Sequence, residues 1–198
     1  MIMYNCIFTP YCTNETCDLA CPVHAEILYW MKRCGLDINN PILNSSTTKI
    51  QYVTNLIKQN RYTVSAFKAD KPVDSAHLFS YVAICNYGLG TGLNGGVYHL
   101  NFQQYLDELK QSWQTKFDSD DLSNMRIWNQ SSNYLIISNL EYVKFGDFES
   151  QTLLSLLQSR DKPDKTTFII LSKKEPLVGS DSVFFSRLKS RLAEVTVQ

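Results

Sequence analysis

The apolar positions along residues 50–192 follow two spacings that alternate along the chain. Strands are predicted at Tyr62–Phe67, Val97–Asn101, Asn133–Ser138 and Thr166–Ser172, and the last two contain continuous apolar runs. Apolar residues three or four positions apart predict helices at Lys49–Gln59, Ser75–Tyr87, Phe102–Lys116, Phe148–Ser159 and Ser182–Leu192. Strands that alternate with helices are typical of a parallel sheet. The pattern therefore predicts an α/β fold in which helices flank a parallel sheet.

A shorter helical pattern precedes this region, at His24–Arg33. It is followed by a turn-rich stretch over residues 36–48, which contains Asn39-Asn40-Pro41. Turn-forming residues of this kind favour a linker. We therefore predict two parts, a small N-terminal module over residues 1–40 and an α/β domain over residues 41–198.

Composition narrows the class of protein. The chain has 198 residues, of which 44% are hydrophobic and 19% charged, and this is typical of a globular protein. Lys and Arg together number 19, as do Asp and Glu, so the net charge gives no general argument for nucleic-acid binding. No apolar run reaches the roughly 20 residues that span a bilayer, and the first residues do not resemble a secretion signal. We expect a cytoplasmic protein with no membrane partner.

Four of the six cysteines lie in the first 21 residues, at Cys6, Cys12, Cys17 and Cys21. In a reducing compartment, clustered thiols indicate a metal site more often than disulfides. Four thiolates on a short polar segment suit tetrahedral zinc, which is the prediction here. An iron–sulfur cluster uses the same ligands and remains an alternative, as do buried or free thiols.

The stretch from Tyr62 to Phe79 is arranged as strand, short loop and helix, like a phosphate-binding loop. Such a loop reads Gly-x-x-x-x-Gly-Lys-Ser/Thr, and the aligned residues here are Ala69, Asp74, Ser75 and Ala76. Without glycines the backbone amides cannot close around a phosphate. The lysine and the magnesium-binding hydroxyl are also missing, and Asp74 adds a negative charge. The sequence predicts a degenerate nucleotide site.

With its elements in this order, the chain resembles the AAA+ ATPases, and among them the helicase loaders of the DnaC/DnaI type and the related initiator DnaA. Asp74–Leu78 is similar to their Gly-Lys-Thr-His-Leu. Tyr134–Glu141 resembles the Walker B strand, with Ser138 and Asn139 where two acidic residues normally stand. Phe184–Leu192 resembles the box VII helix, in which Arg191 is the candidate arginine finger and Arg187 a second candidate contact to a partner.

The resemblance implies an AAA+ core, here without a lid domain, and some loaders carry a cysteine-rich zinc module. It implies a role in DNA replication or in a mobile-element process, through a replicative helicase, an initiator or another AAA+ protein. Because the motif residues are missing, we expect an accessory protein that does not hydrolyse ATP. Two alternatives remain: an active ATPase with an atypical site, and a zinc-dependent regulator that binds DNA.

Overall fold

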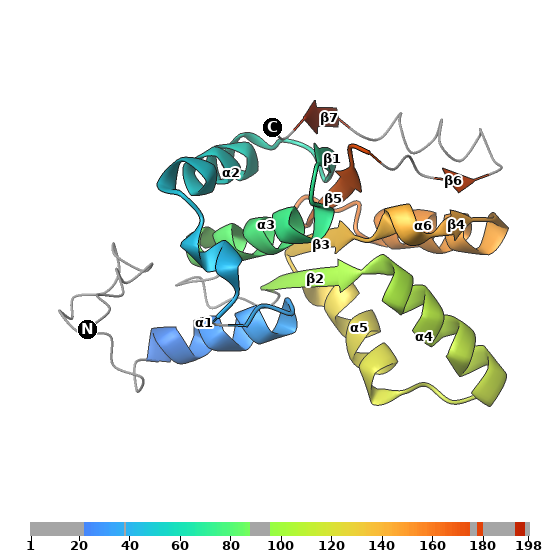
Figure 1. Ribbon diagram of the computed structural model, residues 1–198. Helices are drawn as coiled ribbons and strands as arrows, with labels where there is room; N and C mark the ends of the chain where they lie inside the picture. Colours follow the sequence, from blue (N-terminus) through green and yellow to red (C-terminus); the bar gives the residue numbers. More distant parts are fainter. Residues whose placement is uncertain (1–21, 38, 88–95, 175–177, 180–192, 197–198) are drawn as a thin grey trace.

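The computed structural model describes residues 22–37, 39–87, 96–174, 178–179 and 193–196 (Figure 1). Its main helices are α1 (Pro22–Arg33), α2 (Thr47–Gln59), α3 (Pro72–Tyr87), α4 (Phe102–Thr115), α5 (Asp120–Ser131) and α6 (Asp147–Ser159). Its strands are β1 (Val64–Ala69), β2 (Val97–Asn101), β3 (Tyr134–Ser138), β4 (Lys144–Phe145), β5 (Thr166–Ser172), β6 (Val178–Gly179) and β7 (Ala193–Thr196). Two 3-10 turns complete the list, η1 (Pro41–Asn44) and η2 (Leu140–Tyr142).

Five of the strands form one parallel sheet in the order β2-β3-β5-β1-β7. From β1 the chain crosses to β2 at the far edge, and it then returns through β3 and β5 to pair with β1. The register sets Ala69 at the end of β1 beside Ser172 at the end of β5. The same holds for Asn101 and Ser138 at the ends of β2 and β3. The predicted α/β fold with a parallel sheet is confirmed.

Each face of this sheet carries its own hydrophobic core. Phe67, Ile136 and Phe168 point to the face that α1, α2 and α3 cover, where Phe79 and Ile84 of α3 are fully buried. Their strand neighbours point to the other face, against α4, α5 and α6, as Ile137 and Ile169 do. Strands buried on both faces read as continuous apolar runs, which is why the runs were visible in the sequence.

Helix α1 belongs to the first of these cores and lies along the edge strand β2 (Figure 1). The ring of Trp30 lies against Gly96, where φ is +48° and where a Cβ atom would overlap the ring, so only glycine fits. Arg33 stacks on Trp30 at 4.7 Å and on Trp128 of α5 at 4.4 Å, and so joins the two faces around the edge. The predicted boundary after residue 40 stays a prediction, because the cysteine-rich segment lies outside the described residues.

The observed elements differ from the predicted ones in several places. Helix α3 begins at Pro72, three residues before the predicted start, and α5, β4, β6, β7 and the two 3-10 turns were not predicted. Trp113 follows Leu106 and Leu109 at the spacing of the apolar face of α4, but its side chain is 62% exposed. The amphipathic pattern placed α4 correctly, but it could not show which part of the helix packs on the sheet and which part extends beyond it. The predicted helix Ser182–Leu192 lies outside the described residues, as do Arg187 and Arg191.

Candidate functional site

The carboxyl edge of the sheet is where this topology would place a ligand. The chain leaves β1 on the face of α3, whereas the helices that follow β2 and β3 cover the other face. The loops after the strands therefore diverge beside β1, and ligands of open α/β sheets bind at such a point. The six predicted residues of the degenerate nucleotide site lie at this edge or beside it, on β1, α3 and the end of β3.

The turn between β1 and α3 is much shorter than a phosphate-binding loop. Strand β1 ends at Ala69, and α3 begins at Pro72, so only Asp70 and Lys71 connect them. Proline suits the first helical position because its ring fixes φ and its missing N–H has no helical partner there. Pro72 thus allows the helix to start early. Too few residues remain between strand and helix to wrap around a phosphate.

The three predicted positions after this turn lie inside α3. The backbone N–H of Ser75 donates to the carbonyl of Lys71 at 3.0 Å, which is an ordinary helical hydrogen bond. Ala76 is completely buried against the sheet, and Asp74 is exposed in the first turn. The amide of Ser75 is therefore committed to the helix and not free to bind phosphate oxygens.

Around the turn, positive charges are paired with carboxylates. Lys71 Nζ lies 3.7 Å from Asp74 Oδ2. Lys173, which follows β5, lies 3.4 Å from Asp70 Oδ2 and joins the ends of two neighbouring strands. A triphosphate needs unpaired positive charge and free amides, and here two carboxylates stand beside the helix N-terminus. The arrangement disfavours a polyanionic ligand.

A cavity of about 600 Å³ remains beside the turn, between η1, α2 and α3. Its lining residues include Ala69, Asp74 and Ser75 from the predicted set. Sequence analysis did not select the lining residues Lys49 and Tyr52 of α2. A lysine and a tyrosine on an ordinary amphipathic helix give no signal, because only the packing of α2 beside α3 brings them to this edge.

At the end of β3, Ser138 is turned into the protein and fully buried. Its Oγ lies 2.8 Å from Nε2 of His99 on β2, and Nδ1 of the same ring lies 3.2 Å from the carbonyl oxygen of Cys34. A carbonyl can only accept, so Nδ1 carries the proton and Nε2 accepts from the hydroxyl of Ser138. Burial, and to a lesser extent the neighbouring His77, lowers the pKa of His99 to about 4, which keeps the ring neutral at pH 7.

Asn139 directly follows Ser138 and has left-handed backbone geometry, with φ at +64°. Asparagine adopts this conformation more readily than most residues, and it allows β3 to turn sharply into η2. Neither side chain offers a carboxylate, and the hydroxyl of Ser138 is bonded to His99. Magnesium prefers carboxylate oxygens, so these two positions lack the ligands of a Walker B site.

Two predicted sites lie outside the described residues, the cysteine cluster and the candidate arginine finger Arg191 with Arg187. Cys6, Cys12, Cys17 and Cys21 lie outside the described part of the chain, so the zinc and iron–sulfur predictions stay predictions. Within residues 22–37, 39–87, 96–174, 178–179 and 193–196, three or more His, Cys, Asp or Glu side chains nowhere gather as metal ligands would. Over the same residues, every helix is too short or too polar to cross a bilayer.

Comparison with known proteins gives structural matches alone. Neither a protein-family model nor a curated protein matches the sequence. Domain III of the replication initiation protein DnaA from Thermotoga maritima matches with a TM-score of 0.56 at 12% identity, over 77% of this chain and 62% of that one. DnaA from Aquifex aeolicus, bound to AMPPCP, matches with a TM-score of 0.56 at 10% identity, over 82% of this chain and 51% of that one.

A DnaC helicase loader is also similar, at 14% identity over 86% of this chain and 99% of the loader, but its TM-score of 0.49 is too low to support a conclusion. The DnaA matches show that the chain shares their fold, a parallel sheet flanked by helices. The parallel sheet flanked by helices that the sequence predicted is thus the fold of this DnaA core as well. The chain spans about half to three fifths of those DnaA structures, so the matches describe a shared core.

Proposed function

We propose that this protein is an accessory factor of DNA replication that uses an AAA+-like fold to bind another protein and does not hydrolyse ATP. The observation that carries the proposal is the early start of α3 at Pro72. A fold similar to DnaA, in which helix replaces the phosphate loop, favours a role through protein surfaces. Likeness of fold alone is a weak argument for function, so the loss of the site's chemistry has to support it.

The partners that fit this proposal are a replicative helicase, an initiator or another AAA+ ATPase. Arg191 and Arg187 would contact such a partner, with Arg191 reaching into the neighbour's nucleotide site as an arginine finger. A finger acts on the nucleotide of another subunit and needs only charge and reach, so a subunit without its own nucleotide can still supply one. Cys6, Cys12, Cys17 and Cys21 would hold one structural zinc ion in a separate N-terminal module.

The decisive experiment is sedimentation velocity of the purified protein with the host's replicative helicase and, separately, with its initiator, combined with phosphate-release assays. We expect a complex with one of them and no ATP turnover by this protein alone. A helicase with its own phosphate-loop lysine replaced provides the control, because any hydrolysis in that mixture would belong to this chain. Turnover by the protein alone, or the absence of both complexes, would refute the proposal.

A matched pair of variants tests the finger. Arg191→Ala should leave the fold intact and weaken the complex or lower the partner's ATP turnover. Arg61→Ala, at an exposed arginine just before β1, should change neither.

Elemental analysis of the purified protein should give about one zinc per chain. Iron with visible absorbance would indicate the cluster instead, and absence of metal would remove the module from the proposal.

A further inference from the structure

The helical hairpin α4–α5 extends from the sheet on the side away from α2 (Figure 1). It carries a second pocket. This cavity has a volume of about 810 Å³ and lies where α4 ends and α5 begins. Its lining residues are Ser112, Trp113, Lys116, Phe117, Asp118 and Arg126, which we call the hairpin tip. None of them belongs to the degenerate nucleotide site.

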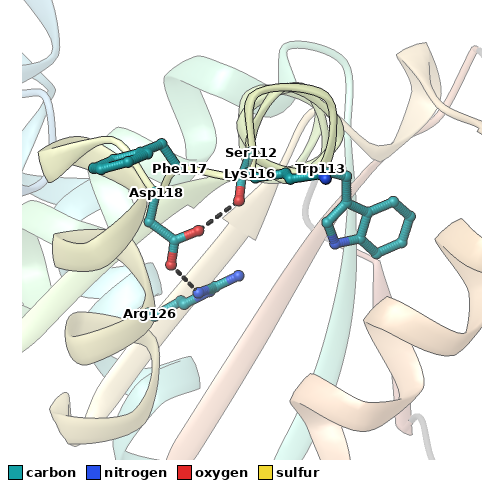
Figure 2. Close-up of a pocket in the computed structure, with 6 residues that line it drawn as sticks. All are labelled: Ser112, Trp113, Lys116, Phe117, Asp118 and Arg126. Carbon is teal, nitrogen blue, oxygen red and sulfur yellow. Dashed lines mark hydrogen bonds and ion pairs between the residues drawn. The ribbon is translucent and has the colours of Figure 1, made fainter.

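Polar contacts fix the shape of the hairpin tip. Figure 2 shows Asp118 between Ser112 of α4 and Arg126 of α5, with one carboxylate oxygen accepting from each. Ser119 adds a second link, since its hydroxyl donates to Glu108 of α4 at 2.7 Å and accepts from the N–H of Leu122 as the cap of α5. The turn is thus held from both helices, and a partner would meet a surface that is already ordered.

The C-terminal half of α4 is also fixed to the body of the protein. Lys110 lies 2.9 Å from Glu149 of α6, and the ring of Trp113 packs against Phe148 with centroids 4.6 Å apart. Trp113 nevertheless remains 62% exposed, and Phe117 is 81% exposed. In Figure 2 these two rings point to opposite sides of Asp118. Large exposed aromatic side chains on a rigid scaffold are the composition of protein-binding hot spots.

The charge of the hairpin selects the kind of partner. Residues 102–131 contain five acidic and three basic side chains, a net charge of −2 in a chain whose overall charge is zero. Asp107, Asp120 and Asp121 are all exposed on it. Negative potential repels the phosphates of a nucleic acid and attracts basic protein segments. Asp120 and Asp121 also stabilise the start of α5, but that role does not remove their charge from the surface.

We propose that the hairpin tip binds a partner protein through an amphipathic segment of that partner, with apolar side chains against Trp113 and Phe117 and basic side chains beside the carboxylates. The inference rests on the proposed accessory function, because it names the surface with which this chain would hold its partner. Rigid aromatic anchors lose little conformational freedom on binding, and complementary charge speeds the encounter.

The test uses the full-length protein and a synthetic probe, so it does not depend on finding the natural partner. The probe is a dye-labelled amphipathic helix of leucine and lysine, about five turns long, and its fluorescence anisotropy is recorded as the protein is added, so the readout does not depend on Trp113. We expect binding that weakens at least severalfold when salt is raised from about 50 to about 200 mM. The double variant Trp113→Ala/Phe117→Ala should bind about tenfold or more weakly, since exposed aromatic hot spots dominate such contacts.

Tyr62→Ala is the matched control, because Tyr62 is a 59% exposed aromatic residue far from the hairpin in the sequence and should not affect binding. Tyr62→Ala should melt like the parent, and the double variant should melt within about 4 °C of it, because it loses only the contact of Trp113 with Phe148. Equal binding by the double variant, or no binding by the parent, would overturn the proposal. So would preferential binding of the glutamate version of the peptide or of oligothymidylate, and so would self-association of the parent through the same two residues.

If the peptide binds at the hairpin tip but no complex forms with helicase or initiator, the surface stands and the proposed function fails. If a complex forms and the double variant retains it, the function stands and this surface is the wrong one. The two proposals can therefore fail independently.

Discussion

The two ends of the sheet differ in where their charged side chains lie: one is buried at the amino edge, and several are exposed at the carboxyl edge. At the amino edge, Arg160 follows α6 and is only 1% exposed. Its guanidinium donates to the carbonyls of Asn129 at 2.6 Å and Ser132 at 2.9 Å, and to the hydroxyl of Thr167 at 2.9 Å. At the carboxyl edge, Asp70, Lys71 and Asp74 are exposed, and the ion pairs that they form have separations of 3.4 and 3.7 Å.

Arg160 is a buried charge that supports the fold, whereas the charges at the carboxyl edge are exposed and paired with one another. Burial lowers the pKa of Arg160 to about 10, so the side chain stays charged at pH 7. The cost of burying this charge is offset by hydrogen bonds to α5, to the residues between α5 and β3, and to β5. Exposed ion pairs contribute about 0–1 kcal/mol because water and salt screen them. The amino edge should therefore be sensitive to substitution and the carboxyl edge tolerant.

The largest expected effect is at Arg160. Arg160→Met should lower the free energy of unfolding by about 3–5 kcal/mol, because it leaves several buried carbonyls without donors. Urea denaturation measures this loss, and a variant too unstable to purify folded would agree with it. Arg61→Met, at an exposed arginine, should stay within about 0.5 kcal/mol of the parent. A loss below about 1 kcal/mol for Arg160→Met would contradict this, because the two edges would then be equally tolerant of substitution.

The next effect concerns pH. Since the folded protein lowers the pKa of His99 from 6.5 to about 4, the unfolded chain takes up the proton first as pH falls. The contribution of neutral His99 to the free energy of unfolding is fully present above pH 6.5. It is lost progressively as the pH falls to about 4. The loss should be about 1–3 kcal/mol, reduced from the full shift because part of the side chain is exposed.

Comparison of urea midpoints for the parent and His99→Gln over this pH range isolates the contribution of His99 from those of the carboxylates. The variant should show a shallower decline. Parallel curves for the two proteins would mean that burial in the folded protein does not shift the pKa of His99.

A smaller effect is expected at the carboxyl edge. Lys173→Met breaks the ion pair with Asp70 and should change the free energy of unfolding by less than about 1 kcal/mol, since Asp70 is largely exposed. Asp70→Asn should behave alike. A loss comparable to that of Arg160→Met in either variant would show that this edge is structurally demanding after all.

The smallest expected effect is on nucleotide binding. Ser75→Lys restores the lysine of the phosphate loop at the aligned position, yet binding of a fluorescent ATP analogue should stay as weak as in the parent. The reason is that residue 75 lies within α3 with its N–H bonded to Lys71, and no glycine loop precedes it. Micromolar binding by the variant would mean that the turn can open, and the proposal of a lost site would fail.

The local pattern of apolar residues was sufficient to predict most strands of the sheet. Thr166–Ser172 and Val97–Asn101 form strands with the predicted bounds, because strands buried on both faces must be apolar throughout. Gly35, which follows α1, has a φ of +67°, and a left-handed glycine commonly ends a helix in this way. The missing glycines, lysine and acidic residues of the nucleotide site were equally visible, since they depend only on residue identity.

Helix α5 was not predicted because few of its inward-facing positions are apolar. Leu122 and Met125 are buried, but the next inward position is Asn129, a polar residue. The signal that could have found the helix is its start, where Ser119 caps it and Asp120 and Asp121 occupy the first turn. Pro72 was a similar start signal for α3, and the alignment with a phosphate loop concealed it.

By itself the sequence determined the alternation of strands and helices, the apolar faces that they bury, and the absence of a working phosphate-binding motif. Tertiary structure decided which strands are neighbours, and thereby that Ser138 bonds to His99 of β2 and that Asp70 meets Lys173 across β1 and β5. It also decided that Arg160 would be buried and Trp113 exposed. The physical reason is the separation of the residues along the chain. Periodicity reflects contacts between residues a few positions apart, whereas Ser138 and His99 are 39 positions apart and Asp70 and Lys173 are 103 apart.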